Sequence, residues 1–151
     1  FDCFAENYEN VLQNISYNVV EKMAEIIPPL KGKVLDLGCG TGLIGEKFKN
    51  TDNVFYGIDL SAAMLKLAES KKVYQNLEHT DALAYLERHK NEFSAIISAD
   101  VFCYFGELRP LLDAASPVRI IFSVETDSLA ETYKIQPNGR YKHNPLYIEN
   151  C

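Results

Sequence analysis

The chain has 151 residues and a mass of 17.1 kDa, enough for one hydrophobic core, and its 47% hydrophobic and 24% charged residues are typical of a globular protein. A formal net charge of −6 and a pI near 5.1 disfavour a nucleic acid as partner. No apolar stretch approaches the roughly 20 residues that cross a membrane, so we expect no membrane partner.

The four cysteines, Cys3, Cys39, Cys103 and Cys151, lie far apart in the sequence. They show none of the spacings that are typical of a metal site, so we expect no bound metal. We interpret them as reduced thiols. Because the N-terminus also lacks the pattern of a signal peptide, the sequence predicts a cytoplasmic protein.

Apolar periodicity predicts helices that alternate with short strands along the chain. The helices are expected at residues 6–27, 41–49, 62–70, from Asp81 to about Arg88, and 107–115. The strands are expected at residues 33–37, 54–58, 76–79, 93–98 and 118–124. Ser61 is expected to cap the helix that follows it. This alternation predicts an α/β fold, a doubly wound Rossmann-like parallel sheet with helices on both faces.

The run VLDLGCGTGLIG at residues 34–45 holds two overlapping glycine signatures. One is GxGxG at Gly38, Gly40 and Gly42, and the other is GxGxxG at Gly40, Gly42 and Gly45. The second signature is typical of turns that hold the pyrophosphate of a dinucleotide. The two therefore indicate different cofactors.

An acidic side chain favours the first signature. Asp36 stands two residues before Gly38, where a carboxylate repels a pyrophosphate and attracts a cation. S-adenosylmethionine carries an ammonium and a sulfonium group, so it matches this charge. Asp59 ends the second strand, where an α/β nucleotide fold presents a carboxylate to ribose hydroxyls, and Asp81 follows the third strand and can accept a hydrogen bond from an adenine amino group.

Four blocks of the chain resemble the class I S-adenosylmethionine-dependent methyltransferases. They are VLDLGCGTG at 34–42, YGIDLSAAMLKLA at 56–68, TDAL at 80–83 and FSAIISADVFCYFGEL at 93–108. The N-terminal FDCFAENYENVLQNISYNVVEKM and the later QPNGRYKHNPLYIE are similar to bacterial and archaeal methyltransferases linked to tetratricopeptide repeats. No such repeat occurs in these residues.

The resemblance implies a role for each matching residue. The methionine part of the cofactor would be surrounded by Asp36, Gly38, Cys39, Gly40 and Gly42. Asp59 would bind the ribose, and the adenine would lie between Leu60 and Met64 with its edge at Asp81 and Ala82. Ala99 and Asp100 would close the pocket near the donor, and Tyr8 or Tyr17 would cap the cofactor.

Two residues are candidates for the acceptor side. Tyr104 is expected to form a wall near the transferred methyl group, and His143 could deprotonate an acceptor hydroxyl or amine. The acidic chain favours a small-molecule acceptor that is methylated on oxygen or nitrogen. Two other functions stay open: an NAD(P)-binding oxidoreductase that uses the GxGxxG signature, and an inactive module that binds the cofactor and interacts with a partner.

The C-terminal end of the sheet differs from the family pattern. Class I methyltransferases have an antiparallel hairpin beside the fifth strand, and the pattern of this chain predicts five strands. We therefore expect one domain over residues 1–151, with a helical cap at residues 1–30, truncated at its C-terminus and lacking the hairpin. A homodimer or another partner would cover the exposed sheet edge.

Overall fold

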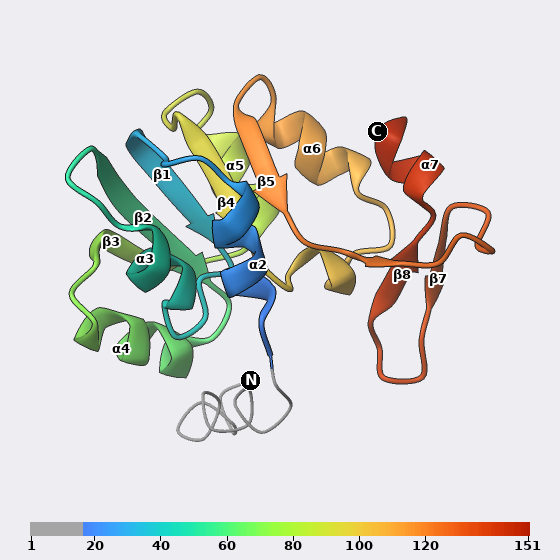
Figure 1. The fold of residues 1–151 in the computed structure, drawn as a ribbon, viewed down its shortest axis with the longest axis horizontal. Helices are drawn as coiled ribbons and strands as arrows, with labels where there is room; N and C mark the ends of the chain where they lie inside the picture. Colours follow the sequence, from blue (N-terminus) through green and yellow to red (C-terminus); the bar gives the residue numbers. More distant parts are fainter. Residues whose placement is uncertain (1–16) are drawn as a thin grey trace.

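The computed structural model describes residues 17–151, and its centre is a five-stranded parallel sheet (Figure 1). The order of the strands is β3-β2-β1-β4-β5, with all four neighbouring pairs parallel. The bounds are β1 Gly32–Leu37, β2 Asn53–Asp59, β3 Tyr74–His79, β4 Ala95–Ser98 and β5 Arg119–Phe122. The doubly wound parallel sheet expected from the sequence is confirmed.

Helices cover both faces of this sheet (Figure 1). They are α2 Val19–Ile26, α3 Leu43–Phe48, α4 Ala62–Ser70, α5 Ala82–Arg88 and α6 Arg109–Ala115, with a 3-10 turn η2 at Phe102–Tyr104. Side chains of β1 alternate between the faces, since Val34 packs with α2 and α3 while Leu35 and Leu37 pack with α5 and α6. The end of β1 is therefore buried on both sides, as its apolar run predicts.

Local capping fixes where two helices begin. The hydroxyl of Ser61 accepts a hydrogen bond from Met64 N–H at 3.2 Å, and the carboxylate of Asp81 accepts one from Ala84 N–H at 3.0 Å. Both side chains satisfy a backbone donor that the first helical turn leaves unpaired. The expected cap at Ser61 and the expected start of α5 after Asp81 are confirmed.

A second, smaller sheet follows β5 and was not predicted from the sequence. It consists of β6 Glu125–Thr126, β7 Tyr133–Ile135 and β8 Tyr141–His143 in the order β6-β8-β7, and α7 Pro145–Glu149 follows it. Strands β7 and β8 are antiparallel, but they belong to this separate sheet and do not extend the main one. Figure 1 shows the small sheet beside the β5 side of the molecule.

Two sequence expectations need adjustment. Strand β5 ends at Phe122 rather than at residue 124, because the chain leaves the main sheet there to enter the small one. The expected helix over residues 6–27 is seen as α2, and its part before residue 17 lies outside the described residues. Within residues 17–151, no helix is long and apolar enough to cross a membrane.

Candidate functional site

The glycine bend after β1 settles which glycine signature forms the turn. Gly38, Gly40 and Gly42 have φ angles of +73°, +52° and +91°, in the left-handed region that favours glycine, whereas Gly45 lies inside α3 and is absent from the positive-φ glycines. A Cβ at Gly45 would lie 2.6 Å from the ring of Tyr74. Gly45 is therefore small because a tyrosine packs on it, and the turn itself follows the GxGxG pattern.

A cleft opens where β1, β2 and β4 end, as expected for a sheet whose order reverses beside β1. Its volume is about 200 Å³, and we call it the main cleft. A smaller hollow of about 40 Å³ lies on the other side of the glycine bend, and both are lined by Gly38, Gly40 and Ala99. A Cβ built on Gly40 would meet nothing within 4 Å, so the bend leaves this space open.

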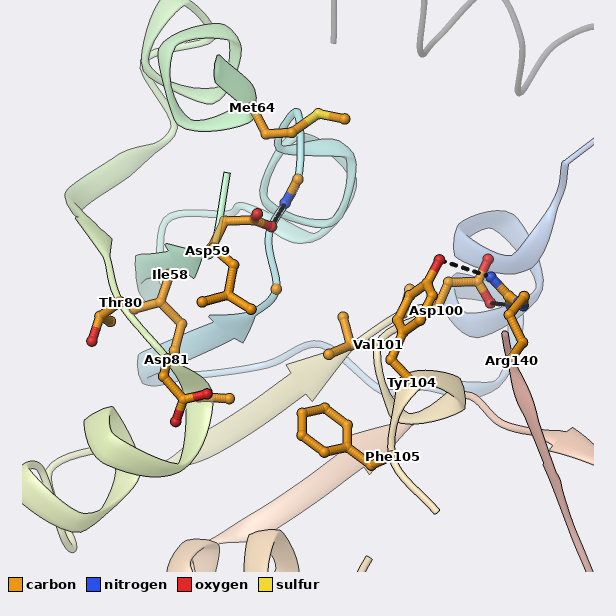
Figure 2. A pocket seen from close by; sticks show the side chains of 15 residues that line it. Ile58, Asp59, Met64, Thr80, Asp81, Asp100, Val101, Tyr104, Phe105 and Arg140 are labelled. Atoms are coloured by element: carbon orange, nitrogen blue, oxygen red, sulfur yellow. Dashed lines mark hydrogen bonds and ion pairs between the residues drawn. The ribbon is translucent and has the colours of Figure 1, made fainter. Parts of the chain in front are cut away.

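Figure 2 shows that the side chains of the main cleft form two groups. At its β2 end lie Asp59, Met64 and Asp81, which follow β2 and β3. At its β4 end lie Tyr104 and Arg140, with Asp100 between β4 and η2. Because β1 separates β2 from β4 in the sheet, the two ends are different regions of one cleft.

Asp59 joins the glycine bend to α4. Its Oδ2 accepts a hydrogen bond from Gly40 N–H and its Oδ1 accepts one from Ser61 N–H, both at 2.8 Å. Each carboxylate oxygen has a second lone pair, so Asp59 can still accept hydroxyl hydrogens from a bound molecule. It thus supports the turn and lines the cleft at the same time.

Asp36 is fully buried and has an unusual environment. Its Oδ2 accepts a hydrogen bond from the Tyr74 hydroxyl at 2.6 Å, while its Oδ1 has no partner within the described part of the chain. Burial, with a further contribution from the charge of Asp59, raises the pKa of Asp36 to about 7, although the Tyr74 hydrogen bond opposes the shift. The hydroxyl of Thr41 is likewise buried without a partner among residues 17–151, and both side chains line the smaller hollow. A cationic group in this hollow would satisfy both oxygens.

Two comparisons with known proteins address the family. Residues 34–118, more than half of the chain, match the family described as "Methyltransferase domain". The chain belongs to this methyltransferase family.

An uncharacterized Haemophilus influenzae protein is 34% identical over 142 residues, covering 82% of this chain and 56% of that protein. YqeM of Bacillus subtilis is 31% identical over 103 residues, covering 66% of this chain and 40% of YqeM. The methyltransferase chain thus spans at most about half of the length of these relatives.

Solved structures share the fold of this methyltransferase domain. The complex described as "DhpI-SAM-HEP" matches with a TM-score of 0.66 at 16% identity, over 99% of this chain and 82% of that one. The magnesium protoporphyrin IX methyltransferase ChlM from Synechocystis, with bound SAM, matches with a TM-score of 0.60 at 18% identity, over 94% and 64%. The cofactor expected from the sequence, S-adenosylmethionine, agrees with the family and with these structures.

Most of the residues predicted to bind the cofactor line the two cavities of the methyltransferase domain. The main cleft is lined by Gly38, Gly40, Asp59, Leu60, Met64, Asp81, Ala82, Ala99 and Asp100. The smaller hollow adds Tyr17, Asp36 and Cys39. Gly42 lines neither cavity and forms the turn, and Tyr8 lies outside the described residues. Burial raises the pKa of the Cys39 thiol well above its usual range, which disfavours the thiolate that a nucleophile requires.

The two residues predicted for the acceptor side have different positions. Tyr104 lines the β4 end of the main cleft and is 42% exposed. His143 is fully buried in the small sheet and does not line the main cleft. Its Nε2 lies 2.9 Å from the carbonyl oxygen of Phe105 and 3.1 Å from that of Gly106. Because carbonyl oxygens only accept, Nε2 carries the proton and His143 ties the segment after η2 to the small sheet.

Tyr74 and Arg140 are among the residues of the site that were not predicted. Tyr74 lies at the start of β3 and holds Asp36, but nothing in the sequence links positions so far apart. Arg140 lines the main cleft because the β7–β8 turn brings it there. The signal for this turn was present as Pro137, Asn138 and Gly139, a combination typical of tight turns, and Gly139 has a φ of +81°.

Proposed function

We propose that this chain binds S-adenosylmethionine across the main cleft and the smaller hollow, and transfers its methyl group to an oxygen or nitrogen atom of a small-molecule acceptor. The observation that carries the proposal is the oxygen of Asp36 that has no partner among residues 17–151, behind an open glycine bend. A buried carboxylate at this position is costly unless a cation meets it, and a pyrophosphate there would be repelled. The methionine ammonium is such a cation.

The cavities suggest how the cofactor is held. Asp59 accepts hydrogen bonds from the ribose hydroxyls, and Leu60 and Met64 contact the adenine at the β2 end of the main cleft. Asp81 and Ala82 lie at the adenine edge. The ammonium of the methionine part faces Asp36, close to Thr41, in the smaller hollow. In this arrangement Tyr17 caps the cofactor from the smaller hollow, and Cys39 contributes packing.

The residues of the chain contribute mainly alignment. When bound, S-adenosylmethionine supplies a methyl group on a positively charged sulfur, which is already a good leaving group. The protein therefore has to orient the acceptor in line with the methyl group and to exclude water. Tyr104, Val101 and Phe105 line the β4 end of the cleft, where the acceptor would enter. No nucleophilic side chain is needed for this chemistry.

Calorimetry with S-adenosylmethionine tests the proposal. We expect an affinity in the micromolar range for the unaltered chain, and a loss of about 1–3 kcal/mol in Asp59→Asn, because hydroxyls lose a charged acceptor. The control is Asp113→Asn, which removes the same charge at an exposed position on α6. This variant should bind S-adenosylmethionine normally. Thermal unfolding of the free variants separates a binding defect from a folding defect. Tighter binding of NAD than of S-adenosylmethionine, or unchanged affinity in Asp59→Asn, would contradict the proposal.

One finer assignment rests on sequence resemblance alone. We propose that the chain belongs to the methyltransferases linked to tetratricopeptide repeats, because of the segments at residues 1–23 and 136–149. The test is to purify the native full-length gene product from its source and to identify the proteins that co-purify with it. The absence of tetratricopeptide repeats both from the full-length product and from the co-purified proteins would contradict this assignment.

A further inference from the structure

The backbone at the β4 end of the main cleft is unusual. Asp100, two residues after β4, has a φ of +57°, in the left-handed region that side chains other than glycine rarely adopt. Its N–H donates a hydrogen bond to the hydroxyl of Ser123 at 2.8 Å. Its side chain is held by Arg140, whose Nη2 donates to Oδ1 at 3.2 Å. Two separate elements therefore keep this carboxylate in the cleft wall.

Each nitrogen of the Arg140 guanidinium makes a hydrogen bond within this cluster. Its Nε donates to Oε1 of Glu125 on β6, and its Nη1 donates to the Tyr104 hydroxyl at 3.3 Å. The guanidinium also lies over the ring of Tyr104, 5.4 Å from the centroid. Arg140 is the only lysine or arginine among the described residues that line the main cleft. Because it faces two carboxylates, the cluster as a whole carries net negative charge.

This arrangement determines which chemical groups the β4 end can receive. An acceptor carboxylate or phosphate would lie beside the Asp100 carboxylate, where the single positive charge of Arg140 is shared between Asp100 and Glu125. The hydrogen bond from Arg140 engages one oxygen of Asp100, so the second oxygen of this cleft-lining carboxylate can accept from another donor. A group with an N–H or O–H bond fits this end, whereas an anion does not.

We propose that Asp100 is a specificity-determining residue of the acceptor site and that Arg140 positions it, so that the acceptor presents an amine or hydroxyl group, not a carboxylate or phosphate. The inference rests on the proposed function, because it assumes that the cofactor occupies the β2 end and the smaller hollow. The aromatic walls at Tyr104 and Phe105 favour an acceptor with a flat apolar part beside its donor group.

Binding of three matched probes tests this without turnover. The chain is first saturated with S-adenosylhomocysteine, and ligand-observed NMR titrations then compare benzylamine, benzyl alcohol and benzoate. We expect benzylamine to bind at least about tenfold more tightly than benzoate, with benzyl alcohol between them. Comparing the affinities of benzylamine and benzyl alcohol shows whether the site prefers a cationic or a neutral hydrogen-bond donor. Calorimetry of the first step reports on the proposed function separately: failure of S-adenosylhomocysteine to bind refutes both the proposed function and this inference.

The key variant is Asp100→Asn. Asparagine tolerates the left-handed conformation and its carbonyl can still accept from Arg140, so the wall keeps its shape while the charge is lost. We expect the preference for benzylamine over benzoate to fall about tenfold in Asp100→Asn and to stay unchanged in Asp113→Asn. With S-adenosylhomocysteine bound, three results would each overturn the inference: benzoate binding as tightly as benzylamine, no binding by any probe, or equal effects of the two variants.

Discussion

Replacing Asp36 with asparagine should make the ligand-free protein more stable and the cofactor complex weaker. Burial raises the pKa of Asp36 from 3.8 to about 7, a difference of about 3 pH units. Each unit corresponds to 1.36 kcal/mol, so ionising this group in the folded state costs about 4 kcal/mol. The folded chain holds the proton more tightly than the unfolded chain does. The free energy of unfolding therefore falls as the pH rises from about 4 to about 7.

Asp36→Asn removes this titration while keeping an acceptor for the Tyr74 hydroxyl. Urea unfolding without ligand should show that the advantage of the variant over the unaltered chain grows by about 3 kcal/mol between pH 5 and pH 8. Calorimetry should show the opposite effect on binding. The affinity of the unaltered chain for S-adenosylmethionine rises through pH 7 as Asp36 ionises, while the variant binds at least about tenfold more weakly at pH 8 and shows little pH dependence.

Asp113→Asn controls for a change in net charge, because it removes an exposed carboxylate remote from the cleft. It should follow the unaltered chain in both measurements. If the difference in the free energy of unfolding between Asp36→Asn and the unaltered chain were the same at pH 5 and pH 8, Asp36 would not titrate in this range. If it bound the cofactor normally at pH 8, the carboxylate would not meet a cation, and the argument for the cofactor would lose its basis.

Tyr74→Phe removes the hydrogen bond that opposes the pKa shift of Asp36, so the fall in stability with pH should extend to a higher pH, which the same urea series measures. Gly45→Ala places a Cβ 2.6 Å from the Tyr74 ring and should lower the free energy of unfolding by about 1–3 kcal/mol; a gain, as alanine normally gives inside a helix, would show that the ring is not packed there. His143→Ala should lower the free energy of unfolding by about 2–4 kcal/mol through a cavity and lost hydrogen bonds, and leave the affinity for S-adenosylhomocysteine unchanged; normal stability would contradict the structural role.

The main sheet could be predicted from the sequence because its signals are local. Short apolar runs with β-branched residues gave four strands of the main sheet, β3 was placed by a weaker pattern, and the serine before Ala62 marked the start of α4. The small sheet has strands of two or three residues, too short for a periodic pattern to identify. Tyr74 and Arg140 reach the site through contacts between distant segments, which a single sequence does not reveal.

The glycine bend and the acid beneath it are best understood together. A turn with three left-handed glycines needs no buried charge behind it, and an asparagine at position 36 could accept the Tyr74 hydrogen bond without the cost of about 4 kcal/mol that ionisation brings. The carboxylate therefore makes physical sense only if something offsets that cost. A cationic ligand in the smaller hollow does so, since it favours the ionised form and supplies a partner that Oδ1 lacks in the described part of the chain. The expected loss of stability of the free domain as Asp36 ionises and the proposed affinity for a positively charged methyl donor would then have a single origin.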